Sequence, residues 1–398
     1  FNLLLKKTEK ANISQKKVLN KNISAPIKKG DKVGLFSKNC DGFVVAYFAV
    51  VKAGGVVVPF NFQLTPKEVA FIVKDTGMKL LLNREHMHLG GALADIGVDW
   101  PLVQITFAEM DNVSADKFTD PGLVGNDCCA IIYTSGTTGR PKGAMLSHRN
   151  LLANMESCQK IVRTTTKDRN VTMLPMYHAF AWTCSVALGL QGGSVNVILE
   201  NFTFSEAIQQ LIKHKVTTFY GVPAMLSLLI KGIPPDMIAN LRLVVTGGAP
   251  LPRSVIDDFY EKFHVLPQEG YGLSEASPVC AVNPTGKVKA GSIGKDLPDV
   301  ELSLMDKEGN FVTVSHQVGE LCVRGENVML GYLNRPEDTA RTIVDGWLHT
   351  GDIAYRDEEG YYFIVDRLKD LIISAGENIY PREIEEELML HPDIAEAS

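Results

Sequence analysis

The chain has 398 residues, of which 45% are hydrophobic and 22% charged, and its formal net charge at pH 7 is −6. This length exceeds a single ordinary hydrophobic core, so two or three lobes are expected. The mild negative charge gives no support for nucleic acid as a partner. Seven cysteines occur without a CxxC pair or a Cys/His spacing suited to zinc. An odd number of cysteines without a disulfide framework predicts a reducing, cytoplasmic compartment.

The first thirty residues are polar and poorly periodic, and a long apolar stretch follows them. The length of this stretch approaches that of a membrane span. It consists of Phe43–Val51 and Val56–Phe60, separated by Lys52, Gly54 and Gly55. Because the charge and the glycines interrupt it, we predict a buried helix, a turn and a strand in place of a transmembrane segment. Peripheral contact with a membrane stays open.

From Asp31 to about Pro284, β-rich apolar runs alternate with helical patterns. The predicted strands are Asp168–Leu174, Ser194–Leu199, Thr217–Tyr220 and Leu241–Thr246. The predicted helices are Ser205–Lys213 and Pro252–Phe263. Alternation of this kind predicts an α/β fold with parallel or mixed sheets that are covered by helices.

The pattern changes between about residues 291 and 355. Short strands such as Val300–Met305 and Gly319–Arg324 are separated by Gly and Asp turns, which predicts a small antiparallel, barrel-like unit. Tyr361–Val365 and Leu371–Ile373 are two further predicted strands. A helix is predicted from Pro381 to about residue 390, because proline suits the first turn of a helix.

The segment 367–370, in which three of four residues are charged, lies between these last apolar strands and predicts an exposed connector. We therefore predict a large N-terminal domain at residues 1–366, made of two helix-covered sheets and the barrel-like unit. A hinge would follow at 367–370, and the start of a small α+β C-terminal domain at 371–398. Both ends look incomplete, so the sequence is expected to be a fragment or the ordered part of a longer protein.

A loop from Tyr133 to Gly143 follows the apolar run 130–132 and carries three glycines, four Ser or Thr hydroxyls and two cations. Glycine lets backbone N–H groups approach a ligand closely. Hydroxyls and N–H groups donate to phosphate oxygens, and the cations offset phosphate charge. The loop therefore predicts a polyphosphate site. Its candidate ligand-binding residues are Thr134, Ser135, Gly136, Thr137, Thr138, Gly139 and Lys142.

The order of residues in this loop differs from the P-loop of nucleoside triphosphatases. That pattern needs a second glycine where Pro141 stands, and a hydroxyl residue where Gly143 follows Lys142. An ordinary Ser/Thr/Gly turn is the alternative. The loop resembles the phosphate-binding signature of the adenylate-forming superfamily, which includes acyl-CoA synthetases, luciferases and peptide-synthetase adenylation domains. The resemblance extends over nearly the whole chain, and is nearest to medium- and long-chain fatty acid CoA ligases.

A second motif, residues 268–278, places Tyr271 between two glycines and ends in Ser274 and Glu275. The resemblance implies that Tyr271 stacks on adenine beside Gly272, that Ser274 meets the α-phosphate, and that Glu275 holds Mg²⁺. One protein carboxylate together with phosphate oxygens is a normal way to bind Mg²⁺. The alternative is a turn at a strand end with an exposed glutamate.

Three further segments are implied to bind the nucleotide. Asp352 resembles a ribose-binding aspartate, because a carboxylate accepts from both vicinal hydroxyls, and Arg367 resembles an arginine that reaches the same nucleotide. A glycine-rich segment resembles the floor of the adenine and acyl pockets. Its residues are Gly247, Gly248, Ala249 and Pro250. A common turn and solvated charges are the alternatives.

Lys369 matches the family's hinge position, where the small domain swings between a pose for adenylation and a pose for thioester formation. Gly376 lies in a loop that resembles the one along the tunnel for the pantetheine arm of coenzyme A. The family's adenylation lysine has no counterpart, because no lysine follows Lys369. If the protein ends at Ser398, we expect crippled adenylation and surviving nucleotide binding.

The segment 174–182 concerns the acid. His178 matches the family's aromatic/His motif beside the substrate carboxylate, although a structural histidine is the alternative. Peptide-synthetase domains have Phe-Asp there, whereas this chain has Tyr177 and His178, which argues against an amino-acid substrate. Trp182 resembles the gate of a fatty-acyl tunnel, and a core aromatic is the alternative. Val222 and Gly247 are further candidate walls of the acyl pocket.

The resemblance implies a two-step reaction with ATP, Mg²⁺ and coenzyme A. A carboxylic acid, expected to be a medium- to long-chain fatty acid, would form acyl-AMP and pyrophosphate, and then acyl-CoA and AMP. The candidate catalytic residues are Lys142, Thr134, Glu275 and His178. The alternatives are an aryl- or coumarate-type CoA ligase, a luciferase-like oxygenase, a nucleotide-binding protein without turnover, and a P-loop triphosphatase.

Overall fold

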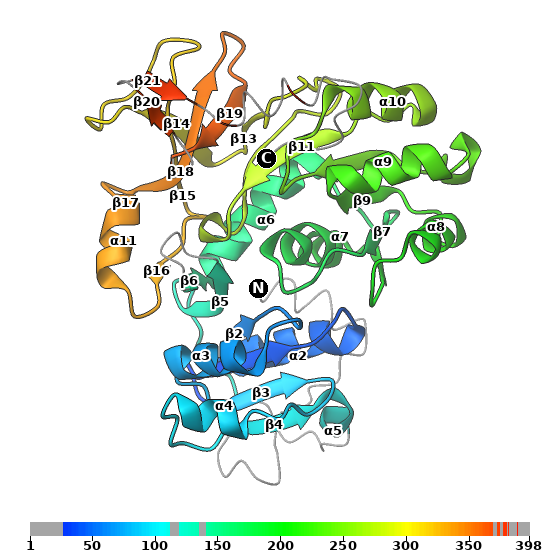
Figure 1. The fold of residues 1–398 in the computed structure, drawn as a ribbon. Helices are drawn as coiled ribbons and strands as arrows, with labels where there is room; N and C mark the ends of the chain where they lie inside the picture. Colours follow the sequence, from blue (N-terminus) through cyan, green and yellow to red (C-terminus); the bar gives the residue numbers. More distant parts are fainter. Residues whose placement is uncertain are drawn as a thin grey trace.

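The computed structural model describes residues 27–111, 119–134, 141–368, 372–374 and 377–379, together with Pro381 and Leu388. Within these residues the longer strands form two seven-stranded sheets and one five-stranded sheet. Figure 1 shows the first sheet and its helices (blue to cyan) below, helices α8 to α10 of the second sheet (green) on the right, and the five-stranded sheet (orange) at the upper left. The α/β fold with a barrel-like unit is thus confirmed.

The first sheet has the order β16-β6-β5-β2-β1-β3-β4. Strands β2, β1, β3 and β4 run parallel, whereas β6 runs antiparallel to β5. Its strands are β1 (Lys32–Phe36), β2 (Val56–Pro59), β3 (Leu80–Asn83), β4 (Val103–Thr106), β5 (Cys128–Thr134), β6 (Lys142–Ser147) and β16 (Gly331–Tyr332). Its helices are α2 (Asp41–Lys52), α3 (Pro66–Thr76), α4 (Gly90–Asp95) and α5 (Phe107–Asp111).

The apolar stretch near the N-terminus forms the helix, turn and strand expected from its interruptions. Helix α2 buries Phe43, Tyr47 and Val51, and all four residues of β2 are buried beside it. Among the described residues, no helix is long and apolar enough to cross a membrane. The interpretation as a membrane span is therefore not needed to explain this stretch.

The second sheet has the order β13-β12-β11-β10-β9-β7-β8, and its strands from β8 to β11 are parallel. The expected strands and helices between residues 168 and 263 are confirmed to within a residue or two. The strands are β7 (Arg169–Thr172), β8 (Val195–Ile198), β9 (Thr218–Gly221), β10 (Leu243–Thr246), β11 (Gln268–Gly272), β12 (Val279–Val282) and β13 (Lys295–Asp296). The helices are η1 (Ala181–Ala187), α7 (Leu188–Gly192), α8 (Phe204–Lys213), α9 (Pro223–Gly232), η2 (Pro235–Ile238), α10 (Arg253–Phe263) and η3 (Ser274–Ala276).

The third sheet is antiparallel and has the order β14-β15-β18-β17, with β19 paired to β18. Its elements are β14 (Val300–Met305), β15 (Gly319–Gly325), α11 (Pro336–Thr342), β17 (Ile343–Val344), β18 (Trp347–Arg356) and β19 (Tyr362–Arg367). A hairpin of β20 (Ile372–Ser374) and β21 (Glu377–Ile379) follows. The hinge residue Lys369 lies outside the described residues, as does most of the helix expected after Pro381. The domain boundaries stay a prediction.

Helix α6 (His148–Val162) connects the three sheets and lies centrally in Figure 1. It begins directly after β6 with a capping box, in which the Ser147 hydroxyl accepts from the Asn150 N–H group. The Asn150 amide also donates to the Val328 carbonyl, which follows the third sheet's β15. Asn154 exchanges two hydrogen bonds with the backbone of Val279 in the second sheet. These buried bonds fix the sheets around one helix.

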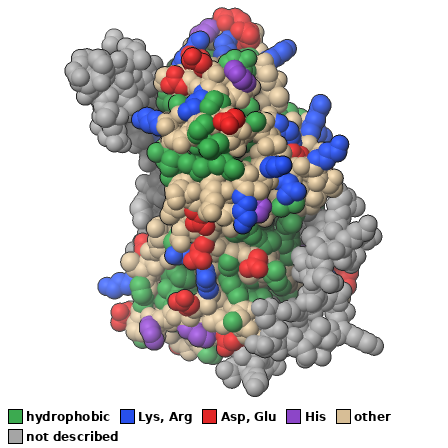
Figure 2. All heavy atoms as spheres, turned by 90° about the vertical axis from the view of Figure 1, so that its right-hand side faces the viewer, with side chains coloured by type: hydrophobic (Ala, Val, Ile, Leu, Met, Phe, Trp, Pro, Cys, Tyr) green, Lys and Arg blue, Asp and Glu red, His purple; other side chains and the backbone are tan. Residues whose placement is uncertain are grey.

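One face of the molecule, turned toward helices α8, α9 and α10, is shown in Figure 2. Basic, acidic and apolar side chains are interspersed over this face. Exposed apolar residues in its helices include Ile212, Leu228 and Tyr260. Basic side chains therefore do not form a continuous surface on this face.

Candidate active site

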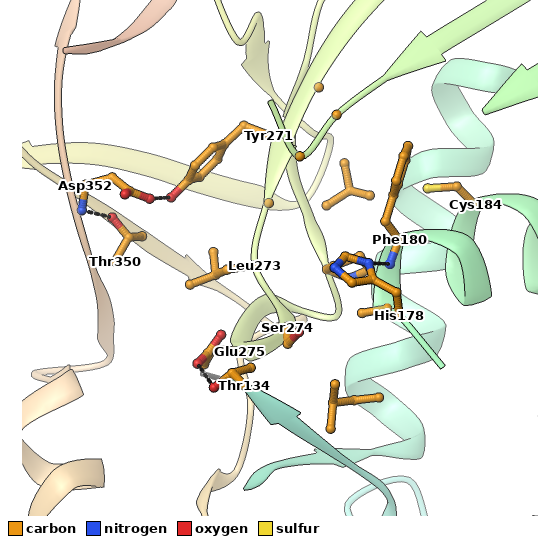
Figure 3. A pocket seen from close by; sticks show the side chains of 18 of the residues that line it. Thr134, His178, Phe180, Cys184, Tyr271, Leu273, Ser274, Glu275, Thr350 and Asp352 are labelled. Carbon is orange, nitrogen blue, oxygen red and sulfur yellow. Dashed lines mark hydrogen bonds between the residues drawn. The ribbon is translucent and has the colours of Figure 1, made fainter. Parts of the chain in front are cut away.

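A cavity of about 890 Å³ lies where the three sheets meet. Its walls come from the end of β5, from β10 to β12 with the turn η3, and from β18 and β19. The segments that the sequence singled out as motifs therefore line one cavity, although Thr134 and Arg367 are 233 positions apart in the chain. Figure 3 shows their side chains around this space.

One end of the cavity is polar and centres on Glu275. The Glu275 side chain is 9% exposed, and its Oε1 accepts from the Thr134 hydroxyl at 3.2 Å and from the Tyr332 hydroxyl at 2.9 Å. Lys142, at the start of β6, lies on the same side, with its Nζ 3.1 Å from an Asp338 oxygen. The other predicted loop residues, Ser135 to Gly139, lie outside the described residues. The described part of the loop is thus close to Glu275.

The turn that carries Ser274 and Glu275 depends on Gly272. A Cβ atom at this position would lie 2.0 Å from the Pro278 carbonyl oxygen, so only glycine fits without displacing the backbone. The Leu273 N–H group donates to the same carbonyl at 3.0 Å and closes the turn. The Glu275 carbonyl in turn accepts from the Met329 N–H group at 2.8 Å. These backbone contacts aim the Glu275 carboxylate into the cavity.

A second polar group lies on the side of the third sheet. The Tyr271 hydroxyl donates to Asp352 Oδ2 at 2.5 Å, and Arg367 Nε lies 3.1 Å from Asp352 Oδ1. Asp352 and Arg367 are directly paired in β18 and β19. Burial, with the Asp352 carboxylate as a lesser cause, raises the pKa of Tyr271 well above its usual value. The structure thus brings together the three residues that were expected to bind the nucleoside.

A bulge in β18 directs Asp352 toward the cavity. The pairing of β15 with β18 shifts register between Glu320 and Cys322, opposite Thr350 and Gly351. Gly351 has φ +74°, a conformation that favours glycine. The Glu320 carboxylate accepts from the Gly351 N–H group at 2.9 Å and lies 2.8 Å from His349 Nδ1. Bulges of this kind re-aim side chains next to active sites.

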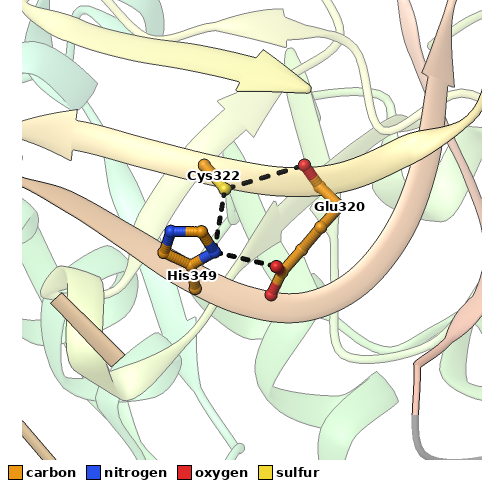
Figure 4. A group of neighbouring side chains, drawn as sticks. All are labelled: Glu320, Cys322 and His349. Carbon is orange, nitrogen blue, oxygen red and sulfur yellow. Dashed lines mark hydrogen bonds and ion pairs between the residues drawn. The ribbon is translucent and has the colours of Figure 1, made fainter. Parts of the chain in front are cut away.

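Glu320, Cys322 and His349 form a compact group beside this bulge (Figure 4). Their nitrogen, oxygen and sulfur atoms lie close enough together for a metal ion, as no other group of described His, Cys, Asp and Glu residues does. However, His349 Nδ1 already contacts both the Glu320 carboxylate and the Cys322 sulfur, and burial raises the pKa of the Cys322 thiol to about 12. Hydrogen bonding accounts for the group, so we assign it to support of the turn.

Sequence reasoning missed Glu320. Its signal is the spacing Glu320-x-Cys322, which places both side chains on one face of a strand, opposite His349. This signal needs the pairing of β15 with β18, which the sequence does not reveal.

The other end of the cavity is apolar. It is lined by side chains of α6, η1 and α7, namely Cys158, Ile161, Val162, Cys184 and Leu188. His178 stands between this end and the polar groups, and Figure 3 shows its ring beside Phe180. The His178 Nδ1 atom accepts from the Phe180 N–H group at 3.3 Å. Desolvation by the surrounding protein lowers the pKa of His178, so the neutral ring is favoured.

Gly247 and Gly248 line the cavity, but Ala249, Pro250, Val222 and Trp182 are not among its lining residues. Trp182 is 5% exposed, and its ring stacks on Tyr47 of α2 with the centroids 3.8 Å apart. This packing favours the alternative interpretation, in which Trp182 is a core aromatic residue. It does not support a gate to an acyl tunnel. Gly376 lies outside the described residues.

A family model described as AMP-binding enzyme matches residues 23–333. The chain belongs to this family. This confirms the expected membership of the adenylate-forming superfamily, and the relatives described next confirm the class of enzyme, an AMP-forming acid–CoA ligase.

The chain also aligns with individual relatives over most of their length. The chain is 35% identical to a long-chain-fatty-acid–CoA ligase of Escherichia coli O157:H7, over 94% of this chain and 74% of the relative. It is also 35% identical to a feruloyl-CoA synthase of Amycolatopsis sp, over 93% of this chain and 75% of the relative. The structure of the O-succinylbenzoate coenzyme A synthetase of Bacillus subtilis, in complex with ATP and a magnesium ion, matches with a TM-score of 0.89 and 27% identity. That match covers 99% of this chain and 85% of the other.

Proposed function

We propose that this protein activates a medium- to long-chain fatty acid with ATP, giving acyl-AMP and pyrophosphate, and transfers the acyl group to coenzyme A. One observation carries the proposal. A single cavity holds the Glu275 carboxylate with its hydroxyl partners, and the hydrogen-bonded side chains of Tyr271 and Asp352, which suit a nucleoside. Its apolar end lies beyond His178. This is the order of groups that an acyl adenylate needs.

The nucleotide is proposed to lie along the polar end. Asp352 can accept from both ribose hydroxyls once its present contact with Tyr271 is rearranged, and Arg367 stays within reach as a cation. The ring of Tyr271 is proposed to lie against adenine. Gly272, next to Tyr271, keeps this turn closed, because a Cβ atom there would meet the Pro278 carbonyl oxygen.

Glu275 is proposed to hold Mg²⁺ together with phosphate oxygens. The residues fit such an ion, since a largely buried carboxylate lies beside the hydroxyls of Thr134 and Tyr332, and oxygen donors are what Mg²⁺ prefers. When bound, the ion would neutralise charge that develops on the phosphates. Ser274 is proposed to meet the α-phosphate from the same turn.

The first step joins two anions, a carboxylate and a triphosphate, so the main task of the side chains is to offset negative charge. Lys142 is proposed to hold the leaving pyrophosphate. His178, favoured in its neutral form, is proposed to donate from Nε2 to the acid, because Nδ1 accepts from Phe180. Orientation of the two reactants in one cavity supplies a further entropic share of the rate.

The apolar end supports an alkyl chain, because Cys158, Val162, Cys184 and Leu188 offer no charged partner for a second carboxylate. The alternative is an aryl acid. It is favoured by the equal identity to a feruloyl-CoA synthase and by the rings of Tyr177 and Phe180 in the cavity wall. Use of coenzyme A, the hinge at Lys369 and the tunnel residue Gly376 belong to the same proposal.

The test is acid-dependent formation of CoA thioester by the full-length protein with ATP and Mg²⁺. A panel would compare straight-chain acids from acetate to palmitate with ferulate and malonate. We expect AMP as the nucleotide product and the highest kcat/KM among medium- or long-chain acids. A preference for ferulate would replace the fatty-acid assignment, and release of ADP instead of AMP would reject the mechanism.

A further inference from the structure

Lys142, which the proposed function assigns to pyrophosphate, is paired in the structure with an acid from outside the nucleotide motifs. Its Nζ lies 3.1 Å from Asp338 Oδ2. The two side chains are only 13% and 20% exposed, so water screens this pair less than a surface ion pair. Lys142 Nζ also lies 5.3 Å from the centre of the Tyr332 ring, which is within range of a cation–π contact. Lys142 therefore has a defined position, in which its ammonium group contacts the Asp338 carboxylate and not the proposed phosphate ligand.

The surroundings of Asp338 explain how it reaches Lys142. Strand β6 begins at Lys142 and pairs with β16, whose residue Tyr332 is opposite Ala144. Helix α11 follows β16 closely, and Figure 1 shows it beside this edge of the first sheet. The short connection brings Asp338, in the first turn of α11, back over the start of β6. The contact thus follows from the local path of the chain.

Asp338 has a second cation. Arg341, one turn later in α11, donates from Nη2 to Asp338 Oδ1 at 2.7 Å, so each carboxylate oxygen has its own partner. Lys142, as the larger cause, and Arg341 lower the pKa of Asp338, which therefore stays ionised at neutral pH. Arg341 lines the cavity as well. Lys142 and Arg341 thus both line the cavity, and Asp338, which is not itself a lining residue, contacts both of them.

We propose that Asp338 is the resident counter-ion of Lys142 and weakens the binding of pyrophosphate, so that this product leaves more readily. This inference rests on the proposed function, which assigns Lys142 to the leaving group. A lysine ammonium cannot contact Asp338 and a phosphate with full strength at once, so pyrophosphate must compete with the aspartate. Once pyrophosphate is bound, the remaining carboxylate repels it.

Arg341 makes this exchange of partners feasible. If Asp338 had Lys142 alone, departure of the lysine toward phosphate would leave a poorly solvated carboxylate without a cation, which is costly. Because Arg341 keeps one oxygen paired, Lys142 can change partner without that penalty. Asp338 thus acts on the binding of the leaving group through its charge alone, and no transfer of protons or covalent bonds is required of it.

A different role would give the opposite sign. If Asp338 helped to hold Mg²⁺ on the phosphates, its neutralisation would weaken binding of pyrophosphate. If it only anchored helix α11, its neutralisation would lower the melting temperature and would not discriminate between ligands. The sign of the change in pyrophosphate affinity therefore separates the counter-ion role from the Mg²⁺ role, and comparison with AMP and the melting temperature separates both from the anchoring role.

The experiment measures binding of magnesium pyrophosphate and of AMP to the full-length protein by calorimetry, without acid or coenzyme A. Asp338→Asn keeps the shape of the side chain and removes its charge. We expect pyrophosphate to bind about three- to tenfold more tightly to this variant, which is the range for a partly screened ion pair. The affinity for AMP, which lacks the leaving phosphates, is expected to change by less than about twofold.

Two further variants serve as controls. Glu337→Gln removes an exposed neighbouring acid of the same helix and is expected to leave both affinities within about twofold. Asp338→Glu restores the charge and is expected to restore the wild-type affinity, even if Asp338→Asn proves poorly folded.

Weaker or unchanged binding of pyrophosphate by Asp338→Asn would overturn the proposal, as would an equal change for AMP. The proposal would also fail if Asp338→Glu, which keeps the charge, bound pyrophosphate as tightly as Asp338→Asn. Failure of the proposed function appears separately, as wild-type protein that binds pyrophosphate and forms no thioester with any acid of the panel.

Discussion

The two ends of the cavity are built in different ways. At the polar end, proposed to bind the nucleotide and below called the nucleotide end, charged and hydroxyl side chains are held by directional contacts, such as Thr134 to Glu275 and Tyr271 to Asp352. At the apolar end, proposed to bind the acid and below called the acid end, side chains such as Cys184 and Leu188 contribute only apolar surface. The first end is therefore organised by hydrogen-bond geometry before any ligand arrives, whereas the second is shaped by packing.

This difference affects what each end can specify. Directional bonds require particular residue types at fixed positions, because an unpaired buried donor or acceptor is costly. An apolar wall can keep its volume with several combinations of side chains. Relatives named for a fatty acid and for ferulate are both 35% identical to this chain, which agrees with a common nucleotide end and variable acid ends.

The largest effect is expected from Glu275→Gln, which removes the charge at the centre of the nucleotide end. We expect kcat/KM for acid-dependent release of pyrophosphate to fall by about 10²- to 10³-fold, as for loss of one main electrostatic contact in a transition state. The side chain keeps its size, and a hydroxyl of Tyr332 can still bond its amide oxygen. A melting temperature close to that of the wild type would show that folding is intact.

Glu275→Asp is the matched control, because it keeps the carboxylate but shortens its reach. It should retain more activity than Glu275→Gln, and added Mg²⁺ should restore part of the loss. Equal activity of the wild type and Glu275→Gln would show that the nucleotide end does not depend on its central carboxylate.

The difference between the ends also explains what the sequence could predict. The strand and helix pattern from residue 168 to residue 263 was predictable, since periodicity records burial directly. Motifs also predicted that Tyr271, Asp352 and Arg367 would come together, and the structure places all three at one cavity; their roles toward the nucleotide stay a prediction. The position of Trp182 was not predictable, because an aromatic residue serves equally well in a core and at a pocket wall, and only its stacking on Tyr47 distinguishes the two.

Glu320 was missed for a different reason. Its contact with the Gly351 N–H group exists only because β15 and β18 pair with a shift in register, and a register shift has no signature in a single sequence. The same holds for Asp338 and Lys142, which are brought together by the path of α11. Supporting contacts between distant strands and loops are thus the part of a site that sequence motifs leave out.

A smaller effect is expected from Asp352→Asn, which removes charge at the nucleoside side. We expect KM for ATP to rise by about tenfold, the usual magnitude for a hydrogen bond to a charged acceptor. With 2′,3′-dideoxy-ATP the wild type should already be impaired, and the substitution should add little. Glu358→Gln, at an exposed acid in the turn between β18 and β19, serves as the control.

Additive effects of Asp352→Asn and of the dideoxy nucleotide would contradict the ribose assignment. In that case Asp352 would act on Tyr271 or Arg367 alone, and the nucleotide end would extend in another direction.

The acid end is tested by Cys184→Phe, which fills part of the apolar space. We expect kcat/KM for palmitate to fall by about tenfold while that for a short acid such as butyrate changes little, because one buried group is worth about 1–3 kcal/mol of discrimination. Overpacking should also lower stability by about 1–3 kcal/mol. Cys184→Ala, which enlarges the same space, should leave the short acid unaffected and tolerate longer chains.

A uniform loss for all chain lengths would show that Cys184→Phe acts through folding and not through the shape of the acid end. Loss for the short acid alone would place its binding site in the space that phenylalanine fills, contrary to the proposed position near His178.

The smallest effect concerns His178, which lies where the two ends meet. Desolvation lowers its pKa below the usual value near 6.5, so the neutral ring should persist as the pH falls to about that value. Below it, the unfolded chain binds the proton more readily than the folded one, and the contribution of His178 to stability is lost as the pH falls further toward the folded pKa. We expect kcat/KM for the acid to decline by a few-fold as the pH falls from about 6.5 toward and through the lowered folded pKa. His178→Gln, which cannot be protonated, should be less active at pH 7 but should show a weaker decline. If His178→Gln and the wild type have parallel profiles, the acidic limb belongs to another group, and the junction of the two ends does not depend on a neutral imidazole.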